Sequence, residues 1–177
     1  MRAYDKAEEA FRHALVIRES LYGKMHADLI ATVDGLAYAF FGERKFDEAE
    51  PVYQRLVGLW GASVGAEHPM VAIALDKAAI FYSEQKKYDQ AKEASGRATA
   101  IRAHFLGNGL AEQAAEQMSE GNKDAAVALY RRALTVLDPP NPIYAEMRGQ
   151  IEDLLNTIAP MPSKALTRKT PVTAKKK

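Results

Sequence analysis

The 177-residue chain has no cysteine, only 11 glycines and 8 prolines, and no long apolar run. The absence of cysteine excludes a disulfide-stapled secreted domain, a thiolate metal site and a cysteine nucleophile. No stretch approaches the roughly 18 consecutive apolar residues that a membrane span needs. Few glycines and prolines beside 31 alanines favour closely packed helices joined by brief turns. We therefore expect a soluble, cytoplasmic chain of all-α class without a membrane span.

The net charge of +1 is unevenly distributed along the chain. Residues 160–177 contain six bases and no acid, which leaves −5 for residues 1–159. The same segment contains Pro160, Pro162 and Pro171 among serine, threonine and alanine. This composition cannot bury enough apolar surface to offset the entropy of ordering. We predict an acidic body over 1–159 and a disordered basic tail over 160–177.

An internal repeat with a period of 42 residues organises the body. Variants of one pentapeptide recur at residues 4–8, 46–50 and 88–92. The turn glycines keep the same step, at Gly23, Gly65 and Gly107, and a shorter fourth copy begins near Lys123. Several features aligned at one spacing indicate a repeat architecture.

Within each copy the apolar residues recur at helical spacing. In the second copy Val33, Leu36 and Phe40 mark one helix, and Tyr53 and Leu56 mark the next. Because one such hairpin cannot bury its own apolar face, the pairs are expected to stack into a solenoid. The predicted units cover about 1–26 (partial), 27–68, 69–108 and 109–140, followed by a capping helix over 142–158.

Three motifs carry a resemblance to a known family: Tyr4–Glu8, the turn Gly65–Pro69, and Val33–Ala37. Together with the spacing of Gly121 and Ala126, they resemble the tetratricopeptide repeat (TPR). The 42-residue copies are similar to the longer type found in kinesin light chains and bacterial relatives. The resemblance covers about residues 1–137 and implies a right-handed superhelix whose concave groove holds an extended peptide.

The first copy has its second helix but lacks its first, because Met1 falls three residues before Tyr4. That leading helix is expected to expose an apolar flank. A partner, another copy of the chain or an upstream portion can cover it. The pattern thus also fits self-association, and it fits a C-terminal structural or assembly fragment of a longer TPR protein.

No constellation of catalytic residues is found, and the sequence predicts no metal site and no cofactor. His26 and His68 lie one period apart, but equivalent positions in stacked repeats are at least about 10 Å apart, too far for one zinc ion. They are interpreted as turn residues that recur with the turn. Gly107–Gly109 lacks the Lys-Ser/Thr of a phosphate loop and is also interpreted as a turn.

A surface stripe on the first helix of each unit is the candidate binding site for a protein or peptide. In proteins that this chain resembles, these positions line the groove: Ala31, Asp34, Tyr38, Phe41, Ile73, Asp76, Ile80 and Ser83. The alternative is that Tyr38 and Phe41 pack against a neighbouring helix, as aromatic residues at helical spacing often do.

The stripe departs from the light-chain pattern of paired asparagines, since this chain has Asp34-Gly35 and Asp76-Lys77. A carboxylate only accepts hydrogen bonds, so two acids in an acidic body favour a basic ligand. The basic tail can itself compete for such a groove, serve only as a solvated terminus, or contact nucleic acid without specificity. The function predicted from the sequence is a non-catalytic protein-binding scaffold, with an assembly fragment or tail-mediated nucleic-acid binding as alternatives.

Overall fold

The structure of the chain, a computed structural model, describes residues 2–160. These residues form seven α-helices and two short 3-10 helices, and they contain no strand. The elements are α1 (Arg2–Tyr22), η1 (Ala27–Leu29), α2 (Ile30–Gly42), α3 (Phe46–Val64), α4 (Pro69–Glu84), α5 (Tyr88–Ser119), α6 (Lys123–Val136), η2 (Pro142–Tyr144) and α7 (Ala145–Ile158). The predicted all-α class is confirmed.

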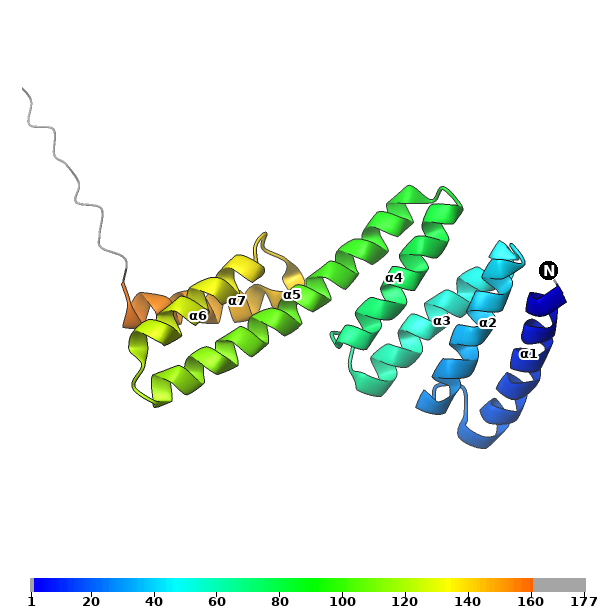
Figure 1. The fold of residues 1–177 in the computed structure, drawn as a ribbon, viewed down its shortest axis with the longest axis horizontal. Helices are drawn as coiled ribbons and strands as arrows, with labels where there is room; N and C mark the ends of the chain where they lie inside the picture. The colour runs from blue at the N-terminus through cyan, green and yellow to red at the C-terminus, as the bar shows by residue number, and fades with distance from the viewer. Residues whose placement is uncertain (1, 161–177) are drawn as a thin grey trace, which may run out of the picture.

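Consecutive helices pack side by side and alternate in direction (Figure 1). Helices α1 to α4 and the first half of α5 form one stack, which we call the N-terminal stack. The second half of α5 packs with α6, and α6 packs with α7; we call this the C-terminal bundle. The long α5 belongs to both parts, so the described chain is an elongated helical solenoid.

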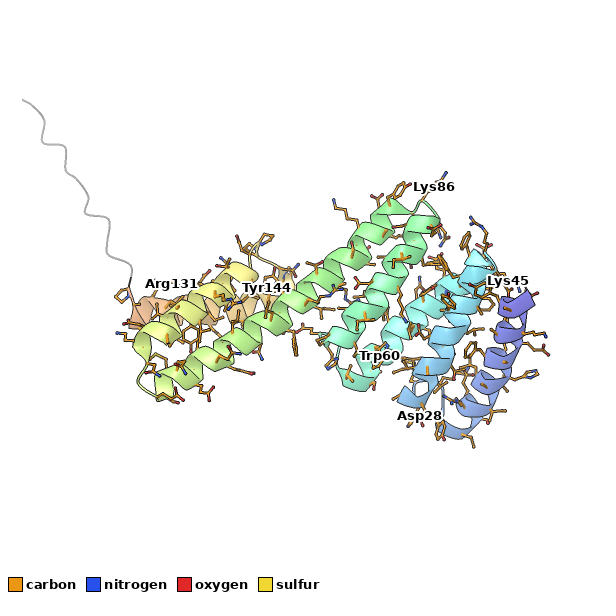
Figure 2. All side chains as sticks on the ribbon, viewed as in Figure 1. Asp28, Lys45, Trp60, Lys86, Arg131 and Tyr144 are labelled. Atoms are coloured by element: carbon orange, nitrogen blue, oxygen red, sulfur yellow. The ribbon has the colours of Figure 1, made fainter. Side chains whose placement is uncertain are left out.

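The turns inside the helix pairs repeat in detail. Arg44 and Lys86, 42 residues apart, both adopt left-handed backbone conformations, with φ of 59° and 60°. Gly121 takes the same conformation in the last pair, with φ of 82°. The amide of the residue after each of them donates to the carbonyl five residues earlier, as for Lys45 to Phe40 at 2.9 Å. The two non-glycine turns lie at the same end of the stack, beside the labels of Lys45 and Lys86 in Figure 2.

The junctions between units are built on a helix cap by histidine. His26 Nδ1 accepts a hydrogen bond from the Asp28 amide, and His68 Nδ1 accepts one from the Met70 amide, each at 3.2 Å. Pro69 follows at the first position of α4, where its missing N–H costs nothing. The interpretation of these histidines as recurring turn residues is confirmed.

The turn expected at Gly107–Gly109 does not form, and the predicted boundary between residues 108 and 109 falls inside α5. The earlier junctions have a capping histidine and, in one case, a proline, whereas Gly107 is followed by Asn108, Gly109 and then strong helix formers. Gly107 is buried, and a Cβ added there would lie 2.8 Å from Leu137 Cδ2. It permits the close approach of α6 to α5 and does not mark a chain reversal.

The last described helices begin at the expected place. The Asn141 side chain accepts from the Ile143 amide at 3.0 Å, and Pro142 opens η2. Ile151 of α7 is buried in the C-terminal bundle, while Leu154 is 37% exposed. At the other end, Val16, Ile17 and Leu21 of α1 are 69%, 59% and 67% exposed, which is the apolar flank expected of a leading helix without its partner.

Candidate binding surface

The predicted groove residues lie on α2 and α4, and most of them reach the surface. Tyr38 and Ile80 occupy equivalent positions one period apart and are 62% and 61% exposed. Ile73 is also exposed, as are Ala31 and Ser83, and Asp34 and Asp76 are half-buried. Two adjacent helices of the stack thus present the same pattern of apolar and acidic side chains.

Phe41 differs from the other members of the stripe. Its ring is half-buried and lies 6.3 Å from the ring of Phe46 and 6.4 Å from that of Phe81, so it packs against the main core cluster. The rings of Tyr38 and Tyr4 form an edge-to-face pair with centroids 5.8 Å apart, while most of the Tyr38 surface stays exposed. The packing alternative therefore describes Phe41 well and Tyr38 only in part.

Each acid of the stripe has a cationic partner on another helix, Asp34 of α2 on α4 and Asp76 of α4 on α5. Lys77 Nζ lies 2.6 Å from both carboxylate oxygens of Asp34, and Arg102 of α5 pairs with Asp76. These side chains are 37–47% exposed, so each pair contributes little stability in water. The pairs leave the stripe without the excess of negative charge that the sequence indicated.

The glycine at position 35 has a structural cause. A Cβ on Gly35 would lie 2.2 Å from the Phe11 ring of α1, so no side chain fits between α1 and α2 there. One period later, where α3 neighbours α4, Lys77 occupies the equivalent place and reaches Asp34. The glycine at position 35, one part of the departure from paired asparagines, thus follows from the packing of α1 against α2.

Two hollows adjoin the stripe. One, of about 630 Å³, lies between α4 and α5; its walls include Asp76, Ile80 and Ser83, and also Tyr88 and Lys92 of α5. Another, of about 850 Å³, has walls from four elements, among them Ala31 and Asp34 of α2 with Ile17, Leu21 and Trp60. Five of the eight stripe residues therefore line one of these two hollows, whereas Tyr38, Phe41 and Ile73 line neither.

Sequence reasoning missed Lys77, Arg102, Tyr88 and Lys92 at this surface. Lys77 could have been found, because Asp34 and Lys77 are separated by one period plus one residue, which places them on adjacent equivalent helices. Arg102 could not, because the equivalent position one period earlier is Trp60, so the repeat gives no sign of a cation there.

Within residues 2–160, no cluster of three or more histidine, aspartate or glutamate side chains could hold a metal ion. No helix in that range combines the length and the hydropathy that crossing a bilayer requires. The basic segment predicted over 160–177 lies, from residue 161 onward, outside the described residues.

The fold and surface define a helical-repeat solenoid of antiparallel helix pairs. Residues 29–103, which span α2, α3, α4 and the first half of α5, match a family model described as Tetratricopeptide repeat. This match supports a TPR protein, and repeats of this kind suggest a protein–protein interaction scaffold. A comparison with curated proteins found no match.

Proposed function

We propose that the chain is a non-catalytic scaffold that binds an extended peptide segment along α2, α4 and the start of α5, in a concave groove of the light-chain-like TPR type. The observation that carries the proposal is the pair Tyr38 and Ile80, large apolar side chains left about three-fifths exposed at equivalent positions. Ile80 also lines the hollow between α4 and α5, and large exposed apolar side chains beside a hollow are typical of binding surfaces.

The contacts argue for apolar side chains as the main determinants of the ligand. Ile80 and Tyr88 line the open hollow of about 630 Å³ between α4 and α5, where apolar side chains of an extended segment can contact them. A preference for lysine- or arginine-bearing ligands gains no support from the ion pairs, because a basic ligand would have to displace Lys77 or Arg102. We expect a peptide's charge to matter less than its apolar residues.

A random peptide library displayed on phage and selected against the chain tests this proposal. Peptides selected on the wild type are expected to lose about tenfold or more in affinity to Ile80→Ala, since burial of a large aliphatic side chain contributes about 1.5–3 kcal/mol. Leu106→Ala is the matched control, because Leu106 is 53% exposed on α5 and lines neither hollow. Equal loss in both variants, or no loss in either, would refute the proposed surface.

A second candidate function, assembly through α1, is favoured by a comparison between copies. Ile17 is 59% exposed, whereas its equivalent one period later, Leu59 of α3, is fully buried against Leu29 and Val33. The helix that would cover Ile17 is the first helix of its own unit, and a second copy of the chain or a further helix can take that place. Sedimentation of the wild type and Ile17→Lys separates the cases: a concentration-dependent dimer lost in the variant supports self-association, and a monomer in both refutes it.

A further inference from the structure

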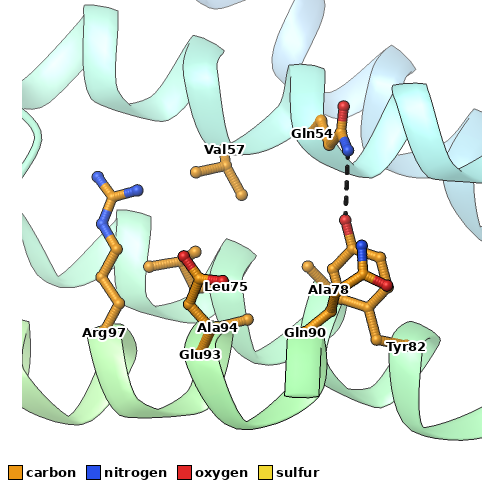
Figure 3. Close-up of a pocket in the computed structure, with 9 residues that line it drawn as sticks. All are labelled: Gln54, Val57, Leu75, Ala78, Tyr82, Gln90, Glu93, Ala94 and Arg97. Atoms are coloured by element: carbon orange, nitrogen blue, oxygen red, sulfur yellow. Dashed lines mark hydrogen bonds between the residues drawn. The ribbon is translucent and has the colours of Figure 1, made fainter. Parts of the chain in front are cut away.

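Helices α3, α4 and α5 enclose a hollow of about 330 Å³ that none of the predicted groove residues lines (Figure 3). Its apolar walls are Val57, Leu75, Ala78 and Ala94. Its polar rim is Gln54, Tyr82, Gln90, Glu93 and Arg97. The Gln54 amide donates to the Tyr82 hydroxyl at 3.3 Å, the one hydrogen bond drawn among these residues.

The preceding copy of the repeat shows what normally fills this space. One period earlier, the places of Val57, Ala78 and Ala94 are taken by three larger aliphatic residues, Leu15, Leu36 and Val52. Leu36 is 3% exposed, and Leu15 and Val52 pack against the same core. Among the four apolar wall positions, only that of Leu75 holds a larger residue than its equivalent, Val33. Because protein interiors are normally close-packed, this loss of aliphatic volume accounts for the hollow between α3 and α5.

The rim of the hollow also differs between the copies, because its arginine has a carboxylate partner in one copy and, among residues 2–160, none in the next. Arg55, the equivalent of Arg97, pairs with Glu19 at 2.6 Å. The place of Glu19 is taken by Gly61 in the next copy, and in the described part of the chain no carboxylate lies within 4.0 Å of the Arg97 guanidinium. The exposed guanidinium of Arg97, beside the apolar hollow, therefore lacks within these residues the carboxylate partner that Arg55 has in the preceding copy.

We propose that this hollow binds a segment of a partner polypeptide, taking one leucine-like side chain between α3 and α5 and a neighbouring carboxylate on Arg97. The aliphatic group is assigned because leucine and valine side chains fill the equivalent space one period earlier. The carboxylate is assigned because Glu19 satisfies the equivalent arginine. Gln54 and Gln90 supply amide donors and acceptors for the main chain of the bound segment. The pocket is separate from the groove on α2 and α4.

The probe is the blocked tripeptide acetyl-Ala-Leu-Glu-amide, titrated while the backbone amide signals of Ala78 and Ala94 are followed by NMR. We expect the signals to shift in a saturable way. The affinity derived from the titration should fall about tenfold when the leucine of the peptide is replaced by alanine. Replacing its glutamate by glutamine should weaken binding to the wild type but not to Arg97→Gln. Equal affinity of the leucine and alanine peptides, or a glutamate preference that persists in Arg97→Gln, would overturn the assignment.

The chain also offers variants that refill the hollow with the residues of the preceding copy. Ala94→Val and Ala78→Leu should abolish the peptide-induced shifts while the melting temperature stays the same or rises. Ala128→Val, which adds the same two methyl groups on the exposed face of α6, should bind like the wild type. If a refilled variant fails to fold, the Arg97→Gln comparison still decides, because it leaves the core unchanged. Binding of 4-methylpentanamide as tight as that of the tripeptide would replace the polypeptide ligand by a small amphipathic one.

Discussion

Two glycines in the middle of α5 provide a direct test of whether Gly107 is required by its packing against Leu137. Gly107 and Gly109 lie two residues apart, but a Cβ on Gly107 would come 2.8 Å from Leu137 Cδ2 and 2.9 Å from its Cγ, whereas a Cβ on Gly109 would meet no atom within 4 Å. Replacing an unrestricted helical glycine by alanine stabilises a helix by about 0.5–1 kcal/mol. We expect that gain for Gly109→Ala.

Gly107→Ala should have the same helical gain and a larger loss. Leu137 is fully buried, so its side chain cannot swing away from the added methyl group. Overpacking of this kind costs about 1–3 kcal/mol, which leaves Gly107→Ala less stable than the wild type by up to about 2 kcal/mol. For a chain of this size each kcal/mol corresponds to about 2–4 °C in melting temperature.

Urea unfolding and thermal melting followed by circular dichroism measure both variants. The background Leu137→Ala removes the obstructing side chain, so Gly107→Ala should become stabilising there. If Gly107→Ala matched Gly109→Ala in the wild-type background, or stayed destabilising without Leu137, the packing explanation for Gly107 would be refuted.

Three further predictions concern the repeated turns and the core. Lys86→Gly should stabilise the chain by about 1 kcal/mol in urea unfolding, because Lys86 adopts a left-handed conformation that strains any residue with a Cβ; a loss of stability would contradict this. His68→Ala should destabilise by about 1 kcal/mol through the lost helix cap, and His68→Asn, which keeps a capping acceptor, should lose much less in the same assay. Burial, with a smaller contribution from the Asp34 carboxylate, raises the pKa of Tyr53 to about 12. The folded state then holds this proton more tightly than the unfolded chain, whose tyrosine titrates near 10, so stability should fall between about pH 10 and 12 by at most about 1.4 kcal/mol per pH unit. Tyr53→Phe should flatten that decline, and an unchanged slope would show that other groups cause it.

The fold of the N-terminal stack could be predicted because its repeat is expressed twice in full. Leu36 and Ala78 mark the same place on successive helices, and His26 and His68 mark successive junctions, so each prediction was supported by a second copy. The path of α5 could not be predicted in this way. Gly107 keeps the 42-residue step of Gly23 and Gly65, yet glycine is required there by packing against Leu137, the residue that follows α6.

The sequence predicted where the residues of the candidate surface lie, but it did not predict the ion pairs that they form. Helical spacing placed Asp34 and Asp76 beside exposed apolar side chains, and it gave no account of the cations that neutralise them. The sequence indicates the hollow between α3 and α5, because Ala78 and Ala94 stand where the preceding copy has Leu36 and Val52. Whether neighbouring side chains fill such a space depends on how the three helices pack, which the sequence pattern does not specify.

The continuity of α5 has a consequence for how its two parts are oriented. A helix of 32 residues extends about 48 Å, and each residue advances it by about 1.5 Å and turns it by about 100°. A single residue inserted near Asn108 would therefore rotate the C-terminal bundle by roughly a quarter turn about the α5 axis while barely lengthening the molecule. The number of residues in α5 therefore sets the direction in which the C-terminal bundle points from the N-terminal stack.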